Sequence, residues 1–225
     1  LWLKKFSILF KKELLINLRN LDSLISILFF TTIIVLIFYF GFSSQSISLN
    51  QFVPAFIWLS ALFGGMLVLT QSYGPEKEGF VMDGIRQAPH IGTAFFLSKF
   101  VYNLLVVLTL ELLTYGMLVI LFNLSNPLQF LATYNLPYIL GAIGFSAVGT
   151  TFANMVSSHN RKEAILSIML YPILIPLIVA VLKCFEFSAS GQLISIESSW
   201  IKILVVFDII YFVLSVLIFD ELIKV

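Results

Sequence analysis

The sequence predicts an all-α polytopic membrane protein, and composition and hydropathy patterning support that fold class. Of the 225 residues, 60% are hydrophobic and 11% are charged, and the mean hydropathy is +1.03. Soluble domains carry about 25% charged residues, so a soluble fold of this length could not hide so much apolar surface. The apolar residues also gather in runs of about 20, the length that crosses ~30 Å of hydrocarbon as a helix.

Six such runs are expected to be transmembrane helices. Transmembrane barrel strands would be about 10 residues long with alternating polarity, whereas these runs are about twice as long and do not alternate. No connection between them is long enough for a soluble domain, so residues 1–225 are expected to form a single transmembrane domain. The runs are Leu24–Gly41, Phe52–Ser72, Ala94–Phe122, Ala132–Val156, Ala164–Leu182 and Ile201–Phe219.

Basic residues predict the orientation of these helices. Cytoplasmic loops carry an excess of Lys and Arg. If both termini are cytoplasmic, 11 of the 13 basic residues lie on the cytoplasmic side. The other two are Lys183 and Lys202. That count assigns Lys99 to the loop before the third helix. The cytoplasmic set is Lys4, Lys5, Lys11, Lys12, Arg19, Lys77, Arg86, Lys99, Arg161, Lys162 and Lys224.

Residues 1–20 predict an amphipathic helix at the membrane surface. On a helical wheel, basic side chains share one arc and large apolar side chains share the other, a pattern typical of helices in the headgroup plane. The alternative is a basic flank that only sets topology. The basic arc holds Lys4, Lys5, Lys11, Lys12 and Arg19, and the apolar arc holds Trp2, Leu3, Phe6, Leu9, Phe10, Leu14 and Ile16.

The segment Tyr73–His90 is a charged island between two apolar runs. Its middle is compatible with a short helix that has an apolar side containing Phe80, Val81 and Ile85. A short amphipathic helix on a cytoplasmic loop suits docking into a groove of a soluble protein, and the alternative is an ordinary solvated connector. The candidate docking residues are Glu76, Lys77, Glu78, Gly79, Asp83 and Arg86.

Motifs for catalysis and metal binding are missing from the sequence. There is no G-x-x-x-x-G-K-[ST] phosphate loop, no G-x-S-x-G and no H-E-x-x-H, so we expect a non-catalytic chain without an intrinsic cofactor. His90 and His159 have no second ligand at metal-binding spacing, and we expect both to be solvated loop residues. The lone Cys184 excludes an internal disulfide, and a net charge of +1 argues against a nucleic-acid partner.

Two acidic residues lie inside apolar runs. Glu111 is near the middle of the third run, and Asp208 lies in the sixth. A carboxyl at such depth costs free energy, so it marks either a functional site or a structural hydrogen bond to a neighbouring helix. Tyr115, one turn after Glu111, is a candidate partner. Two separated acids could also form a proton path.

The fourth run carries small residues at spacings of three and four. Such a stripe allows another helix to approach closely, either within the subunit or across a dimer interface. The small residues are Ala142, Ser146, Gly149, Thr150 and Ala153.

Three stretches resemble the CcmB family, membrane subunits of type-2 ABC exporters in cytochrome c maturation. The first is VPAFIWLSALFGGML from Val53, and the second is the charged loop to Pro89 followed by FFLSKFVYNLL, which contains Lys99. The third is ILGAIGFSAVGTTFA followed by AILSIMLYPILIPLIV, whose prolines Pro172 and Pro176 are four residues apart. Two prolines are unusual in a spanning helix because each removes a backbone donor.

The resemblance implies a docking loop with partners. The family's loop usually reads Asp-Gly-Ser/Thr-Leu-Glu, whereas this chain has Glu78-Gly79-Phe80-Val81-Met82-Asp83, without a hydroxyl and with one extra residue. By the resemblance, we expect a homodimer in the bacterial inner membrane, in contact with lipid. Its partners would be a CcmA-like ATPase, which supplies ATP hydrolysis, and a CcmC-like haem-handling subunit. The expected task is delivery of haem or release of the haem-loaded chaperone.

Two alternatives remain at this stage. One is a type-2 ABC permease of the same architecture that moves lipid, polysaccharide or drug. The other is a proton-coupled carrier that uses Glu111 and Asp208.

Overall fold

The computed structural model describes residues 2–42, 52–74, 84–85, 87, 91–124, 126–157, 159, 161–189 and 198–223. Within these residues the chain is helical and contains no strand. Seven long helices account for most of it: α1 (Trp2–Arg19), α2 (Leu21–Phe42), α3 (Val53–Gln71), α6 (Gly92–Phe122), α7 (Pro127–Val156), α8 (Lys162–Ala189) and α9 (Ser199–Leu222).

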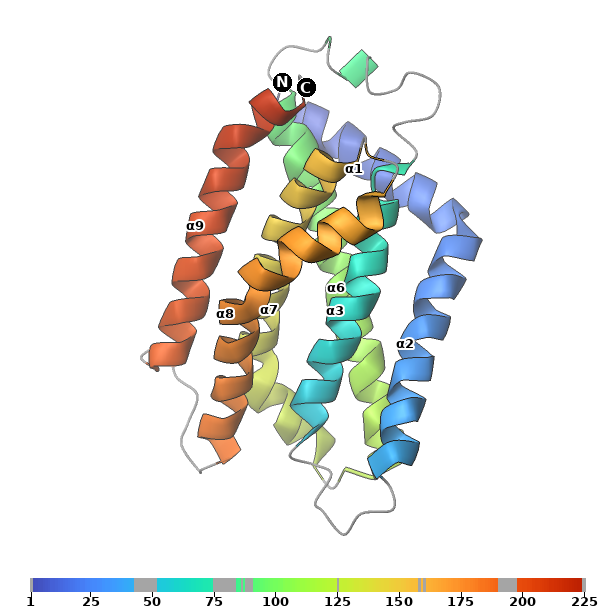
Figure 1. Cartoon of the computed structure of the whole chain (residues 1–225), viewed down its shortest axis with the longest axis vertical. Coiled ribbons are helices and arrows are strands. Elements are labelled where there is room, and N and C mark those ends of the chain that lie inside the picture. Colours follow the sequence, from blue (N-terminus) through green and yellow to red (C-terminus); the bar gives the residue numbers. More distant parts are fainter. Residues whose placement is uncertain are drawn as a thin grey trace.

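Six of these helices form a bundle, and α1 lies across one end of it (Figure 1). Both chain termini lie at that end, which we call the terminal end of the bundle. Successive helices of the bundle run in alternating directions, so α3 finishes and α6 starts at the terminal end. α1 packs against the first part of α6 and against α2. The helix expected over residues 1–20 is therefore present, and it contacts the bundle as well as solvent.

Five helices are long and apolar enough to cross a membrane: α3, α6, α7, α8 and α9. α2 contributes a shorter apolar stretch, Ile25–Gly41. The structure thus supports a multi-pass membrane protein. The first of the six predicted spans is shorter than the other five. Large apolar side chains such as Ile120 and Leu217 are exposed on the bundle surface, as expected where lipid is the solvent.

α7 lies at the centre of the packing, in contact with α3, α6, α8 and α9. Its glycines let neighbours approach closely: a Cβ on Gly141 would lie 2.1 Å from the Trp58 ring, and one on Gly149 would lie 2.4 Å from Leu69 Cδ1. The small-residue stripe is buried within this single chain. The stripe therefore serves packing within the subunit, and not a contact between subunits.

α8 changes direction along its length (Figure 1). It contains both Pro172 and Pro176. A proline inside a helix removes a backbone hydrogen bond and clashes with the preceding turn, which bends the helix. Both proline side chains lie on the exposed side of the helix. The pair identified in the sequence therefore shapes the helix and does not line the core.

Several helices extend beyond the apolar runs expected from the sequence. α7 starts at Pro127, five residues before the expected Ala132, because proline is well suited to the first turn of a helix. α8 continues to Ala189, so Lys183 and Cys184 lie inside the helix and not after it. Hydropathy marks where lipid contact ends, whereas backbone hydrogen bonding can continue past that point.

Candidate functional site

The predicted docking residues Glu76, Lys77, Glu78, Gly79, Asp83 and Arg86 lie outside the described residues. The structure does describe the start of that segment, Tyr73 and Gly74, and three residues further inside it, Gly84, Ile85 and Gln87. Ile85 is buried and belongs to the main hydrophobic core. The docking role of the segment stays a prediction.

Lys99 is the main correction to the sequence analysis. The basic-residue count places it in the loop before the third helix, although the expected run Ala94–Phe122 contains it. It lies in α6 and its side chain is completely buried. It is seven positions after Gly92, which places it ~10 Å along the helix at 1.5 Å per residue. A buried ammonium group needs an ion pair and hydrogen bonds to offset the loss of hydration.

The Lys99 ammonium group is held by partners from two other helices. Its Nζ lies 2.8 Å from Glu13 Oε2 of α1 and donates a hydrogen bond to the carbonyl oxygen of Ser72, directly after α3. It also lies 4.7 Å from the centroid of the Tyr73 ring, within cation–π range. Glu13 is equally buried, and its other oxygen pairs with Lys12 at 2.9 Å.

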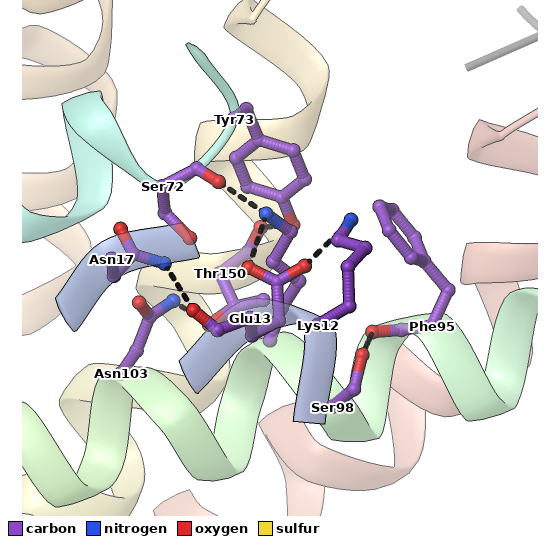
Figure 2. Close-up of polar contacts among 10 residues, drawn as sticks. Lys12, Glu13, Asn17, Ser72, Tyr73, Phe95, Ser98, Asn103 and Thr150 are labelled. Atoms are coloured by element: carbon purple, nitrogen blue, oxygen red, sulfur yellow. Dashed lines mark hydrogen bonds and ion pairs between the residues drawn. The ribbon is translucent and has the colours of Figure 1, made fainter. Parts of the chain in front are cut away.

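A second set of bonds continues from the end of α3 into α7 (Figure 2). The buried Tyr73 hydroxyl donates to the backbone oxygen of Thr150 at 2.9 Å. Asn103 of α6 donates from Nδ2 to Thr150 Oγ1, also at 2.9 Å. Tyr73, the first residue of the predicted docking segment, is thereby tied to α7. Ser72, just before it, is tied to Lys99 of α6, which in turn pairs with Glu13 of α1.

We call Glu13, Ser72, Tyr73, Lys99, Asn103 and Thr150 the junction. It joins four helices at the place where α3 gives way to the docking segment. A displacement of the docking segment would act first on Ser72 and Tyr73, and through their bonds on α1, α6 and α7.

Sequence reasoning missed Glu13 as a site residue, although a signal was present. On the helical wheel, Glu13 lies in the middle of the apolar arc, between Leu9 and Phe6. An acidic residue on the buried face of a helix requires a cationic partner. Lys99, an isolated cation inside an apolar run, is that cationic partner.

Glu111 lies elsewhere, in the wall of a cavity between α3, α6 and α7. The cavity has a volume of about 280 Å³ and is lined by Ile57, Leu108, Glu111, Leu112, Tyr115, Leu131, Asn135, Tyr138 and Ile139. The hydroxyl of the expected partner Tyr115 donates to the backbone oxygen of Pro127 and not to Glu111 Oε1. Glu111 Oε1 has no hydrogen-bond partner among the described residues.

Asp208 is buried on α9 beside Gly144 of α7, where a Cβ would lie 2.5 Å from Asp208 Oδ1. Neither of its oxygens finds a hydrogen-bond partner in the described part of the chain. Asp208 is not among the residues that line the Glu111 cavity. The two acids thus lie in separate surroundings.

Metal binding finds no support in the described residues, which contain no group of three potential His, Cys, Asp or Glu ligands. His159 is exposed, as expected, whereas His90 lies outside the described residues. Cys184 is buried as a free thiol.

Comparison with known protein families identifies the family of this chain. No curated protein matches the chain at a significant level. A family model described as "CcmB protein" matches residues 4–225, which includes every helix of the bundle and almost all of α1. Because that match covers essentially the whole sequence, the chain belongs to the CcmB protein family.

Proposed function

We propose that this chain is the six-helix permease subunit of a type-2 ABC transporter. It is a multi-pass membrane protein of a family that serves haem export and cytochrome c biogenesis. The observation that carries the proposal is the family match over residues 4–225. The absence of a phosphate loop from the sequence agrees with an energy source on another polypeptide.

In this proposal, residues 73–90 are the coupling segment. A CcmA-like ATPase binds there, and its ATP-driven closure moves the segment. The junction supports this role, because Ser72 and Tyr73 connect the start of the segment directly to Lys99 and Thr150. The chain itself holds no cofactor and uses ATP only through its partner.

The remaining parts of the proposal concern assembly and place. The positive-inside count favours cytoplasmic termini, and the family implies a bacterial inner membrane. Two copies form a homodimer with two ATPase subunits and a CcmC-like haem-handling subunit, since a type-2 exporter needs two six-helix halves. A single membrane subunit in the assembled complex, measured by native mass spectrometry, would refute the homodimer.

Charge reversal in the docking segment tests the coupling role. The double variant Glu78→Lys/Asp83→Lys is expected to remain in the membrane but to lose co-purification of the ATPase. Glu186→Lys is the matched control, because Glu186 is an exposed acid near the opposite end of the bundle. Unchanged co-purification of the ATPase with the double variant would contradict the proposed docking site.

Deletion of the gene tests the biological role. Haem staining of membranes should then show loss of c-type cytochromes, with recovery when the intact chain is restored. Normal c-type cytochromes in the deletion strain would favour the alternative ABC transporter, which moves lipid, polysaccharide or drug.

A proton-coupled carrier is the second candidate function. It is favoured by the buried carboxyl oxygens of Glu111 and Asp208 that have no partner in the described residues. The variant Glu111→Gln separates the two functions, because it keeps the shape of the side chain and removes its charge. Normal c-type cytochromes with this variant would remove the main support for the carrier.

A further inference from the structure

The Glu111 cavity is separate from the junction and has no part in the proposed coupling. Glu111 lies 19 positions after Gly92 and 11 before Phe122, or ~29 Å and ~17 Å along α6 at 1.5 Å per residue. The cavity is therefore in the half of the bundle away from the terminal end. No residue of the junction lines it.

The cavity opens to the side of the bundle. Its inner wall contains Ile57, Glu111 and Tyr138, which are all buried. Its rim contains Leu112, Asn135 and Ile139, which are all exposed. Because the neighbouring surface of α6 and α7 is apolar and faces lipid in a membrane, a molecule dissolved in the bilayer can reach the inner wall directly.

Two polar atoms of the inner wall have no partner within the described residues. They are Glu111 Oε1 and the hydroxyl oxygen of Tyr138, and the exposed fractions of these residues are 5% and 6%. A buried polar group without a hydrogen bond costs about 1–3 kcal/mol, more if it is charged. Such atoms on the wall of an open cavity indicate a ligand that supplies the missing bonds.

We propose that this cavity binds a membrane-soluble amine, with its ammonium group between Glu111 and Tyr138 and its apolar chain leaving between α6 and α7. An ammonium group donates hydrogen bonds and accepts none, which complements a carboxylate and a phenol oxygen. The charge-assisted bond to the carboxylate is the stronger contact. This inference goes beyond the proposed function, and the permease role does not depend on it.

The size of the cavity favours a small amphiphile. Pockets for drug-sized ligands measure about 300–1,000 Å³, and this one holds about 280 Å³. That volume accommodates a head group and the first part of a chain. A transmembrane helix of another protein could insert only a single side chain, and occupancy by such a side chain is one outcome of the test below.

A protection experiment on the intact chain in phosphatidylcholine nanodiscs tests the proposal. Dicyclohexylcarbodiimide is a hydrophobic reagent that modifies carboxyl groups in apolar surroundings, and mass spectrometry measures its adduct on Glu111. The probe is N,N-dimethyldodecylamine, a tertiary amine that cannot form an amide with the activated carboxyl. We expect it to slow labelling of Glu111 about fivefold, because a charge-assisted hydrogen bond occupies the carboxylate.

Matched ligands and residues provide the controls. Dodecanol and dodecanoate have the same chain without a cationic head, and each should change the labelling rate less than about twofold. Asp208 is the internal control, because it is a buried acid outside the cavity, and the amine should leave its labelling unchanged. Tyr138→Phe keeps the carboxyl and the ring. Because the protonated tertiary amine has a single N–H, which pairs with Glu111, this variant should change protection of Glu111 by less than about twofold.

Three results would overturn the proposal. Absence of labelling at Glu111 without any ligand would mean that bilayer-soluble molecules do not reach the cavity. Equal protection by dodecanol would mean that the head group does not matter. Protection that requires a co-purified membrane partner, and not the amine, would assign the cavity to a side chain of that partner. Each of these results leaves the proposed permease function intact.

Discussion

Two regions of this molecule bury acidic side chains in opposite ways. At the junction, Glu13 is paired with both Lys99 and Lys12, and the surrounding hydrogen bonds join four helices. In the other half of the bundle, Glu111 and Asp208 are equally buried but have carboxyl oxygens without partners in the described residues. A paired buried charge fixes the geometry of its helices. An unpaired one lowers the stability of the fold and remains available to a ligand or a proton.

Removing one half of the buried ion pair should have the largest effect on stability. Lys99→Met leaves the buried Glu13 carboxylate with fewer partners, and we expect a loss of about 3–5 kcal/mol in the free energy of unfolding. Denaturant unfolding in detergent micelles measures it. Glu13→Leu/Lys99→Met should recover much of the loss, because neither charge remains.

The exposed ion pair Lys183–Glu186 is the control for this prediction. Lys183→Met should cost less than about 1 kcal/mol, since exposed pairs contribute little. Equal losses for Lys99→Met and Lys183→Met would mean that the junction does not depend on its buried charges.

Where buried charges have no partners, close helix packing should make the larger contribution to the free energy of unfolding. Gly141→Ala puts a Cβ 2.1 Å from the Trp58 ring, and we expect a loss of about 1–3 kcal/mol from overpacking. Gly116→Ala is the matched control, because a Cβ there meets no atom within 4 Å. A harmless Gly141→Ala would show that α3 and α7 can separate at no cost.

The link between α3 and α7 should contribute a smaller amount. Tyr73→Phe removes the hydrogen bond to Thr150 but keeps the ring beside Lys99. We expect a loss of about 0.5–1.5 kcal/mol in unfolding free energy, together with weaker stimulation of ATP hydrolysis in the assembled transporter. Unaltered ATPase stimulation would remove Tyr73 from the coupling route.

The smallest effect is expected at Asp208. Asp208→Asn keeps the shape of a side chain whose oxygens have no hydrogen-bond partner in the described residues. No bond is lost, so the free energy of unfolding should change by less than about 1 kcal/mol. A loss as large as that of Lys99→Met would erase the contrast between the two regions.

Particular residues show how far the sequence analysis reached. It located the long apolar helices and the helix over residues 1–20, because hydropathy and charge are properties of neighbouring residues. Its docking role for residues 73–90 stays a prediction. Its basic-residue count places Lys99 in a loop, and it offers Tyr115 as a candidate partner for Glu111. The structure differs at both residues because their surroundings come from other helices: Glu13 is 86 positions from Lys99 in sequence, and the cavity combines residues of α3, α6 and α7.

By itself, the sequence determined the class of the protein. Its apolar runs require helices, since in lipid each backbone polar group must be bonded within its own segment. The tertiary structure decided which buried charges are paired, because pairing depends on how helices pack. Gly141 and Gly149 of α7 set how closely α3 packs against α7, because they leave room for Trp58 and Leu69. The same packing joined Lys99 to Glu13 and left Glu111 facing a cavity.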